Sequence, residues 1–139
     1  MALAETIGVI PYSPLGGGLL TGKYGVGRSP EAGRLATHEI YRTRYGDDLY
    51  YEVAERFTLF ARDRGFDPAS LAVAWVAGHP AVTAPIIGAR NAVQLRASLA
   101  AVDIPMTEAL RAEISALAPE PAPATDRSEE RSAYTFGIR

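Results

Sequence analysis

The sequence predicts an α/β fold, because two segments show a short apolar strand that runs into a glycine-containing turn. Near the N-terminus, residues 7–12 (IGVIPY) have the apolar, β-branched composition of a buried strand. Residues 82–87 (VTAPII) have the same character, and a helical pattern follows them after a short turn. Helical patterns also lie between the two segments. Open and barrel α/β folds have this order and place their ligands at the carboxyl ends of the strands.

The glycine-rich segment after the first strand is residues 13–25 (SPLGGGLLTGKYG). Ser13 begins a turn with the proline after it, and three consecutive glycines make a backbone that a ligand can approach closely. The segment matches neither GxxxxGK[ST] nor GxGxxG, the two common phosphate-binding patterns. On these residues alone, a mobile surface loop and a ligand-binding loop are equally good interpretations, and Lys23 is more typical of a solvated lysine.

Residues 26–47 show no sustained period and are rich in Gly, Arg, Ser and Pro. We predict a long loop here, with one helical turn at most. A loop of this length in a compact domain is usually functional or mobile, so the two hypotheses are a lid and a disordered connection.

Two helices are predicted in the middle of the chain. The first begins with Asp47 or Asp48 as its N-cap and ends at Gly65. The second begins at Asp67, which a proline follows, and stops at residues 78–80 (GHP). The spacing predicts that they bury Tyr50, Val53, Ala54, Phe57 and Phe60 or Ala61 in the first helix, and Leu71, Ala72, Trp75 and Val76 in the second.

The turn after the second strand is a candidate anion site. Gly88 lets the backbone turn sharply or lie close to a ligand, and Asn91 is a good N-cap with Gln94 three residues on, as in a variant of the capping box. The first N–H groups of the helix and the donor fork of Arg90 suit a phosphate. Taken alone, however, a strand, glycine and helix in this order more often form an ordinary strand-to-helix connection with an exposed arginine.

The last elements are the helix after this turn, a further helix and a tail. In the first of the two helices, Leu95, Leu99 and Val102 repeat at helical spacing. Thr107 caps the second, which buries Leu110, Ile114 and Leu117. Residues 1–118 therefore form the expected domain, and residues 119–139 form a Pro/Ala/Glu-rich linker and a loosely attached tail.

Composition excludes several functional classes. The formal charge of -2 and the lack of a basic run argue against nucleic acid as a partner. Cysteine is absent and the only histidines, His38 and His79, are far apart, so no metal site is expected. No N-terminal targeting signal and no apolar window of membrane-spanning length occur, so we expect a cytoplasmic protein without a membrane partner.

Residues 12–24 (YSPLGGGLLTGKY) and 85–95 (PIIGARNAVQL) resemble two motifs of the aldo-keto reductase family. These are the loop after the seventh barrel strand, and the eighth strand with the phosphate-binding turn behind it. The resemblance extends from residue 5 to about residue 118. It implies the C-terminal part of a (β/α)8 TIM-type barrel, incomplete in this chain. It also implies NADPH as the cofactor, used by the family to reduce aldehydes and ketones by hydride transfer.

The resemblance also implies which residues contact this nicotinamide dinucleotide. Ser13, Leu15 and Gly17 would line the pyrophosphate side, Lys23 would help close the loop, and Gly88, Ala89 and Arg90 would surround the 2′-phosphate with Gln94 nearby.

The chain departs from the family pattern at two points. Where the family often places an acidic residue and an asparagine against the adenosine, this chain has Ala97 and Ser98. The family's catalytic Asp, Tyr, Lys and His precede the matched segments, so no catalytic residue is assigned. We therefore expect a truncated oxidoreductase that is inactive alone, whose partner is a missing N-terminal barrel half or a second copy. The alternative is a non-catalytic nucleotide-binding or interaction protein, or a decayed remnant; the substrate is not predicted.

Overall fold

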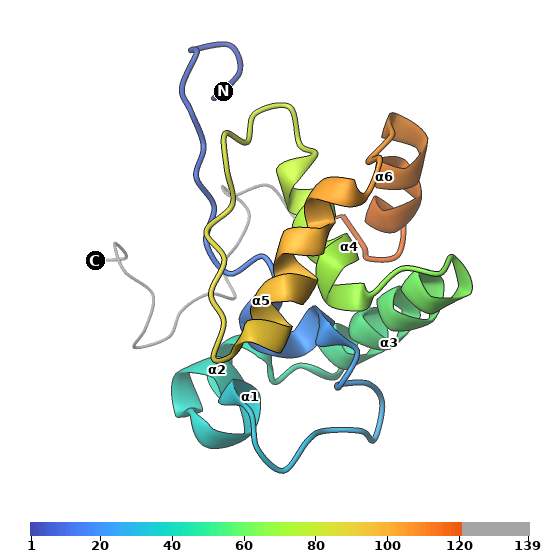
Figure 1. The fold of residues 1–139 in the computed structure, drawn as a ribbon. Coiled ribbons are helices and arrows are strands. Elements are labelled where there is room, and N and C mark those ends of the chain that lie inside the picture. Colours follow the sequence, from blue (N-terminus) through green and yellow to red (C-terminus); the bar gives the residue numbers. More distant parts are fainter. Residues whose placement is uncertain (121–139) are drawn as a thin grey trace.

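The computed structural model describes residues 1–120, and its elements are helices joined by extended segments (Figure 1). In chain order they are the 3-10 helix η1 (Gly16–Thr21), α1 (Arg34–Thr37), α2 (Glu39–Tyr45), α3 (Asp48–Asp63), α4 (Pro68–Ala77), α5 (Ala92–Leu99), the 3-10 helix η2 (Ala100–Asp103) and α6 (Glu108–Ser115). Apart from its first two residues, the predicted linker and tail at 119–139 lie outside the described residues.

The two predicted strands lie side by side but do not form a sheet. Within residues 1–120 there is no β-strand, and segments 7–12 and 82–87 meet only at two isolated parallel bridges. These bridges join Val9 to Val82 and Tyr12 to Ile86. The prediction of an incomplete (β/α)8 barrel is therefore wrong for the part of the chain that the structure describes.

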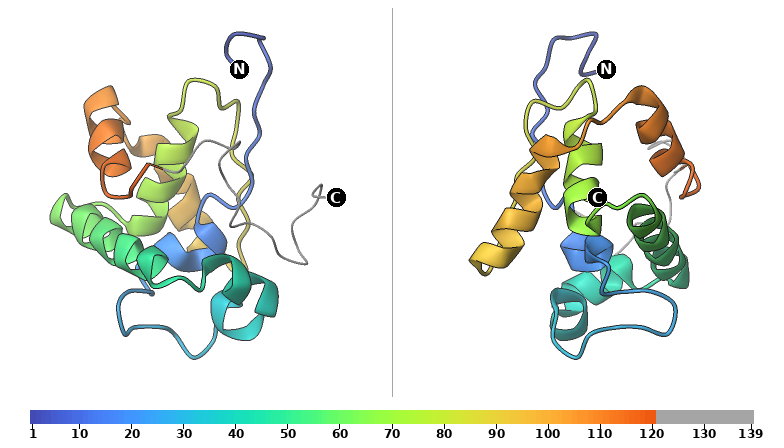
Figure 2. Two further views of the ribbon diagram at one scale, coloured as in Figure 1. Left: turned by 180° about the vertical axis from the view of Figure 1, so that it is seen from behind. Right: turned by 45° about the vertical axis from the view of Figure 1, so that its right-hand side comes forward.

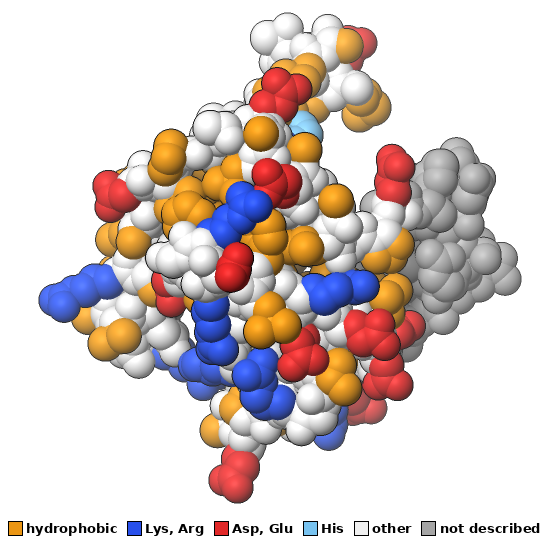
Figure 3. Space-filling model, turned by 90° about the vertical axis from the view of Figure 1, so that its right-hand side faces the viewer, with side chains coloured by type: hydrophobic (Ala, Val, Ile, Leu, Met, Phe, Trp, Pro, Cys, Tyr) orange, Lys and Arg blue, Asp and Glu red, His pale blue; other side chains and the backbone are white. Residues whose placement is uncertain are grey.

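The reason is that apolar composition predicts a buried strand only where neighbouring strands supply a continuous ladder. Here each segment has the other as its backbone partner, through hydrogen bonds of 2.8 Å from Thr83 N–H to the Val9 carbonyl and from Ile86 N–H to the Pro11 carbonyl. Several of their apolar side chains stay exposed, as Ile10 (62%) and Tyr12 (68%) show. Figure 3 shows hydrophobic side chains exposed between charged ones on one face of the molecule.

The central element of the fold is α4. Its buried residues run without a break from Pro68 to Ala74, so it is covered on almost every side. It contacts α3, α5 and both 3-10 helices, which surround it in both views of Figure 2. Few polar side chains occur in it, as expected for a helix without a solvent face.

The largest hydrophobic core lies between α3, α4 and α6. Its buried members are Phe57 and Ala61 from α3, Leu71 and Ala72 from α4, and Leu110 and Ile114 from α6. The predicted inward faces of these three helices are thereby confirmed at these positions. Burial of each large apolar side chain contributes about 1.5–3 kcal/mol, so this core stabilises the arrangement of the three helices.

The helix starts follow the predicted capping residues. Side chains of Asp47, Asp67, Asn91 and Thr107 each accept a hydrogen bond from a backbone N–H in the first turn of α3, α4, α5 and α6. Such a cap typically contributes about 1 kcal/mol. These short side chains therefore set where the four helices begin.

The prediction for residues 26–47 is wrong in its second half, where α1 and α2 replace the expected loop. Their stability comes from contacts that no local period reveals. Leu35 is buried, the rings of Tyr41 and Tyr45 stack with centroids 6.4 Å apart, and both tyrosines pack against the cluster formed by Leu19, Tyr24, Leu35 and Ala54.

The predicted helix α5 forms, but the apolar residues that repeat along it do not mark its buried face. Leu95, Leu99 and Val102 are exposed, and Ser98 is the buried residue of the helix. The helix lies against α4 with a different face from the one that its leucines mark. No helix among residues 1–120 combines the length and apolar character needed to cross a membrane.

Candidate functional site

A cleft of about 480 Å³ lies where the glycine-rich segment, the start of α1 and the start of α5 meet. Its walls come from residues 12–24, 30–34, 67–69 and 86–98, and none of these groups forms the cleft alone. The volume falls within the range of small-molecule sites. The fold therefore brings distant parts of the sequence to one concave surface.

All the cofactor-binding residues predicted from sequence line this one cleft. They are Ser13, Leu15, Gly17, Lys23, Gly88, Ala89, Arg90 and Gln94. Their meeting is a property of the fold, while their contact with a cofactor stays a prediction.

The turn before α5 is held by two side-chain hydrogen bonds. Asn91 Oδ1 accepts from the Gln94 backbone N–H at 3.0 Å, and Gln94 Oε1 accepts from the Arg90 backbone N–H at 3.0 Å. A standard capping box returns to the N-cap residue itself, whereas this one returns to the residue before it. Gln94 therefore fixes the backbone that carries Arg90, a residue of the cleft wall.

The fold requires glycine at position 17 but not at position 88. A Cβ added at Gly88 would meet no atom within 4 Å, so nothing in the described fold excludes a side chain there. Gly17 has a left-handed φ of 68°, and a Cβ there would lie 2.7 Å from Cδ1 of Tyr41. The glycine-rich segment is thus a 3-10 helix covered by a tyrosine ring, and open space at the cleft remains beside Gly88.

Arg34 is a cleft residue that the sequence did not reveal. It stands at the start of α1, in the stretch predicted to be a loop, and its guanidinium carbon lies 5.8 Å from the centre of the Tyr41 ring. With Lys23 and Arg90 it gives the cleft three cations, against one acidic residue, Asp67. A concave surface with this balance attracts anions. No local pattern marks Arg34, because only the packing of α1 places it here.

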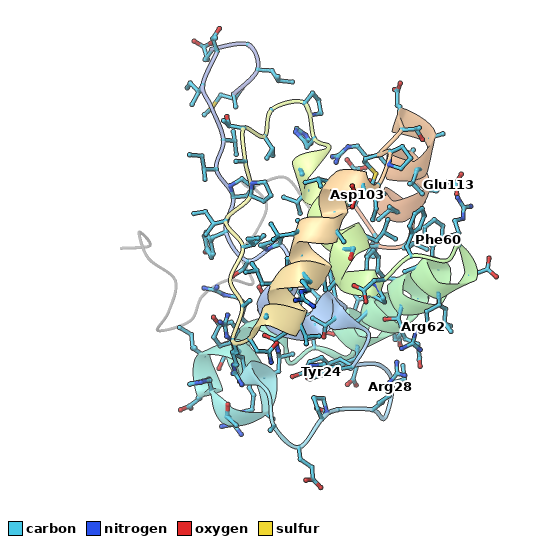
Figure 4. All side chains as sticks on the ribbon, in the orientation of Figure 1. Tyr24, Arg28, Phe60, Arg62, Asp103 and Glu113 are labelled. Carbon is cyan, nitrogen blue, oxygen red and sulfur yellow. The ribbon has the colours of Figure 1, made fainter. Side chains whose placement is uncertain are left out.

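Tyr24 forms part of the cleft wall and packs in the core cluster beside it. The side chain is only 2% exposed. Burial, and then the neighbouring Tyr51, raise the pKa of Tyr24 above its ordinary value, while the Leu35 hydrogen bond and Arg90 oppose the shift. Arg28 donates to the Tyr24 carbonyl at 3.2 Å, and the two residues lie together in Figure 4. Tyr24 is therefore a neutral structural side chain at ordinary pH.

The described residues hold no cluster of three or more side chains suited to a metal ion. His79 has a local role, since its Nδ1 accepts a hydrogen bond of 3.0 Å from the Ala81 N–H just after α4.

Comparison with known proteins identifies relatives that are much longer than this chain. Protein tas of Escherichia coli is 33% identical over 113 residues, which is 81% of this chain and 32% of that protein. The uncharacterized oxidoreductase YrpG of Bacillus subtilis is 34% identical over 118 residues, 83% of this chain and 33% of that protein. A probable voltage-gated potassium channel subunit beta of Arabidopsis thaliana is 36% identical over 101 residues, which is 70% of this chain and 30% of that protein.

The chain thus spans about a third of the length of these curated relatives. The family model that matches it covers residues 1–119 and describes the Aldo/keto reductase family. The chain belongs to the aldo/keto reductase family.

Proposed function

We propose that the cleft binds NADPH and that this chain is the C-terminal, cofactor-binding portion of an aldo-keto reductase. Membership of the family implies an oxidoreductase. The observation that carries the proposal is that residues of both predicted cofactor motifs line a single cleft with Lys23, Arg34 and Arg90. When bound, NADPH supplies the hydride that reduces an aldehyde or ketone.

The residues of the cleft fit the phosphates of such a cofactor. Arg90 presents a planar donor fork that suits a 2′-phosphate, and it lies beside the N-terminus of α5, the positive end of the helix dipole. The open space beside Gly88 leaves room for a phosphate to approach the backbone. Ser13, Leu15 and Gly17 then face the pyrophosphate side of the dinucleotide.

We assign no proton donor for carbonyl reduction to this cleft. Such a step needs a group whose pKa favours proton transfer near neutral pH. Tyr24 does not suit this role, because burial raises its pKa above the ordinary tyrosine value. The chain supplies cofactor binding, and catalysis needs residues from elsewhere.

Calorimetric titration of the purified chain with NADPH and, separately, NADH tests the proposal. We expect saturable binding that prefers NADPH, and Arg90→Ala should lower NADPH affinity about 10-fold or more through loss of a charge-assisted contact. Arg96→Ala is the matched control, since Arg96 is an exposed arginine of the same helix that does not line the cleft. Equal affinity of the wild type for both cofactors would refute the role of Arg90.

A second candidate function is self-association through the exposed apolar surface of segments 7–12 and 82–87. Ile7, Ile10, Tyr12 and Ile86 are all more than half exposed, and the two segments lack further backbone partners within residues 1–120. Exposed apolar side chains on unpaired extended backbone favour pairing with another copy. Sedimentation velocity of the wild type and of Ile10→Lys decides between a monomer and an assembly that uses this surface.

A further inference from the structure

The outer face of α5 and η2 carries an apolar stripe, formed by Leu95, Leu99 and Val102. These side chains are 42%, 51% and 86% exposed. Their spacing of four and then three residues places them on one side of a helix. None of the three lines the cleft, and α5 lies at the edge of the molecule in the right-hand view of Figure 2. The apolar stripe is therefore a surface separate from the proposed cofactor site.

The stripe stays exposed because α5 packs against α4 with a different side, which carries small residues. Ser98 is 3% exposed, and Ala101 at the start of η2 is 8% exposed. The buried Ser70 hydroxyl of α4 also donates a hydrogen bond of 2.6 Å to the Ala97 carbonyl. These contacts hold α5 in place without its large apolar side chains. Apolar side chains that gather on the outside of a fixed helix are typical of a protein interaction surface.

Two opposite charges flank the apolar stripe. Between residues 92 and 103, the charged residues are Arg96 and Asp103. η2 continues α5 without a break, because Leu99 and Ala100 both have right-handed helical backbone. At about 100° and 1.5 Å per residue, Arg96 and Asp103 lie on the same side of the stripe and about 10 Å apart along the helix. Figure 4 shows Asp103 at the end of this element. Both side chains are exposed, and neither forms an ion pair within residues 1–120.

We propose that the apolar stripe binds a second copy of this chain, with the two α5–η2 elements antiparallel about a two-fold axis near Leu99. Such an axis reverses the direction of the helix and keeps each flank on the same side of the pair. Arg96 and Asp103 stand equally far before and after the point midway between residues 99 and 100. Arg96 of each copy therefore lies beside Asp103 of the other, and Leu95 of each copy lies beside Val102 of the other. This charge complementarity favours a second copy as the partner.

The geometry also predicts how strong the association is. One pair of short helices buries little surface, and small interfaces form weak, reversible complexes. The two ion pairs are exposed, so they fix the orientation of the copies more than they add affinity. We therefore expect an equilibrium between monomer and dimer that depends on protein concentration.

Sedimentation velocity over a series of concentrations tests the surface. The wild type should shift from monomer to dimer as its concentration rises. Leu99→Lys should abolish the dimer, because it places two ammonium groups against each other at the centre of the pair. Leu59→Lys is the matched control, since Leu59 is an exposed leucine of α3, and it should leave the dimer unchanged.

Reversal of single charges tests the antiparallel pairing. Arg96→Glu and Asp103→Arg should each weaken the dimer about 10-fold, because two attractive pairs in each dimer become repulsive. An equal mixture of the two variants should restore the association, since each cation then faces an anion across the axis. All of these positions are exposed, so the melting temperatures of the variants should match that of the wild type.

Three results would overturn the inference. The first is a wild type that stays monomeric at every concentration. The second is a dimer that persists in Leu99→Lys and is lost in Ile10→Lys, which would place the contact at segments 7–12 and 82–87. The third is a mixture of the two charge variants that stays as weak as each variant alone, which would exclude the antiparallel pair. The inference does not depend on NADPH binding, because the apolar stripe lies outside the cleft.

Discussion

The fold constrains Gly17 but leaves open space at Gly88. Gly88→Ala should change the free energy of unfolding by no more than about 0.5 kcal/mol, because the added methyl meets open space. The same methyl should weaken NADPH binding by occupying the space beside the backbone. Urea unfolding and calorimetry on the same preparation measure the two effects.

Gly17→Ala is the contrasting variant. Its left-handed backbone alone predicts a loss of stability of about 1–2 kcal/mol. The added methyl would also meet the nearby Tyr41 ring. If Gly88→Ala destabilised the chain as much as Gly17→Ala, this would contradict the open space around Gly88. If Gly88→Ala bound NADPH normally, the ligand would not approach that backbone.

Tyr24 gives a prediction about pH. Its pKa is raised in the folded chain, chiefly by burial, so the folded state keeps this proton at a pH where the unfolded state has lost it. Stability is therefore fully present below about pH 10, the ordinary tyrosine value, and falls as the pH rises beyond it. Burial raises the pKa of Tyr45 in the same sense.

The measurement is the urea midpoint of the wild type and of Tyr24→Phe on either side of pH 10. The loss of stability at the higher pH should be smaller in Tyr24→Phe, which has no proton to lose at this site. An identical loss in both proteins would show that Tyr24 does not contribute to it.

At the scale of the element, α5 is a short helix whose cap is local to the turn that carries Arg90. The helix has eight residues, and its leucines are exposed. Asn91→Ala should therefore cost about 1 kcal/mol and increase amide hydrogen exchange through residues 92–99, because the Gln94 N–H loses its acceptor. It should also weaken NADPH binding, since the same turn carries Arg90.

The control for this prediction is Thr107→Ala, which removes an equivalent cap from α6, away from the cleft. It should increase exchange in α6 and leave NADPH affinity unchanged. Equal effects of the two variants on affinity would mean that general destabilisation, and not the Arg90 turn, weakens the binding.

Helices with local signals were predictable, and elements that depend on distant partners were not. Asp67 followed by proline, and Thr107 before an apolar period, carry their cap chemistry within a few residues, and both helices form as expected. Segment 7–12 looks like a buried strand, but its environment depends on residues far along the chain. α2 depends on the packing of its tyrosines against η1, and no periodic pattern of apolar residues in the sequence indicates this packing.

The residues of the candidate site also fall into those that local sequence could predict and those that it could not. Arg90, Asn91 and Gln94 could be predicted because their interactions are local to one turn. Arg34 and Asp67 could not, because only the packing of α1 and α4 brings them to the cleft. Local chemistry thus marked the turn that carries Arg90, whereas the positions of Arg34 and Asp67 in the cleft needed the three-dimensional structure.

At the scale of the whole molecule, the chain matches about a third of the length of its curated relatives. The chain alone, mixed with NADPH and a panel of aldehydes and ketones, should show no loss of NADPH absorbance above the rate without protein. The reason is that the proposed cofactor site contains no group assigned to protonate a carbonyl. Turnover that Arg90→Ala abolishes would contradict this and would place catalytic residues within the chain.

The measurement that tests the central claim most directly is a titration of the isotope-labelled chain with NADPH, followed by amide chemical shifts. If two distant segments form one cofactor cleft, amides of residues 13–23 and 88–94 should shift together and give a single dissociation constant. Residues of α6, which do not line the cleft, should stay unchanged. Shifts confined to one segment, or shifts spread evenly over the chain, would contradict a shared site.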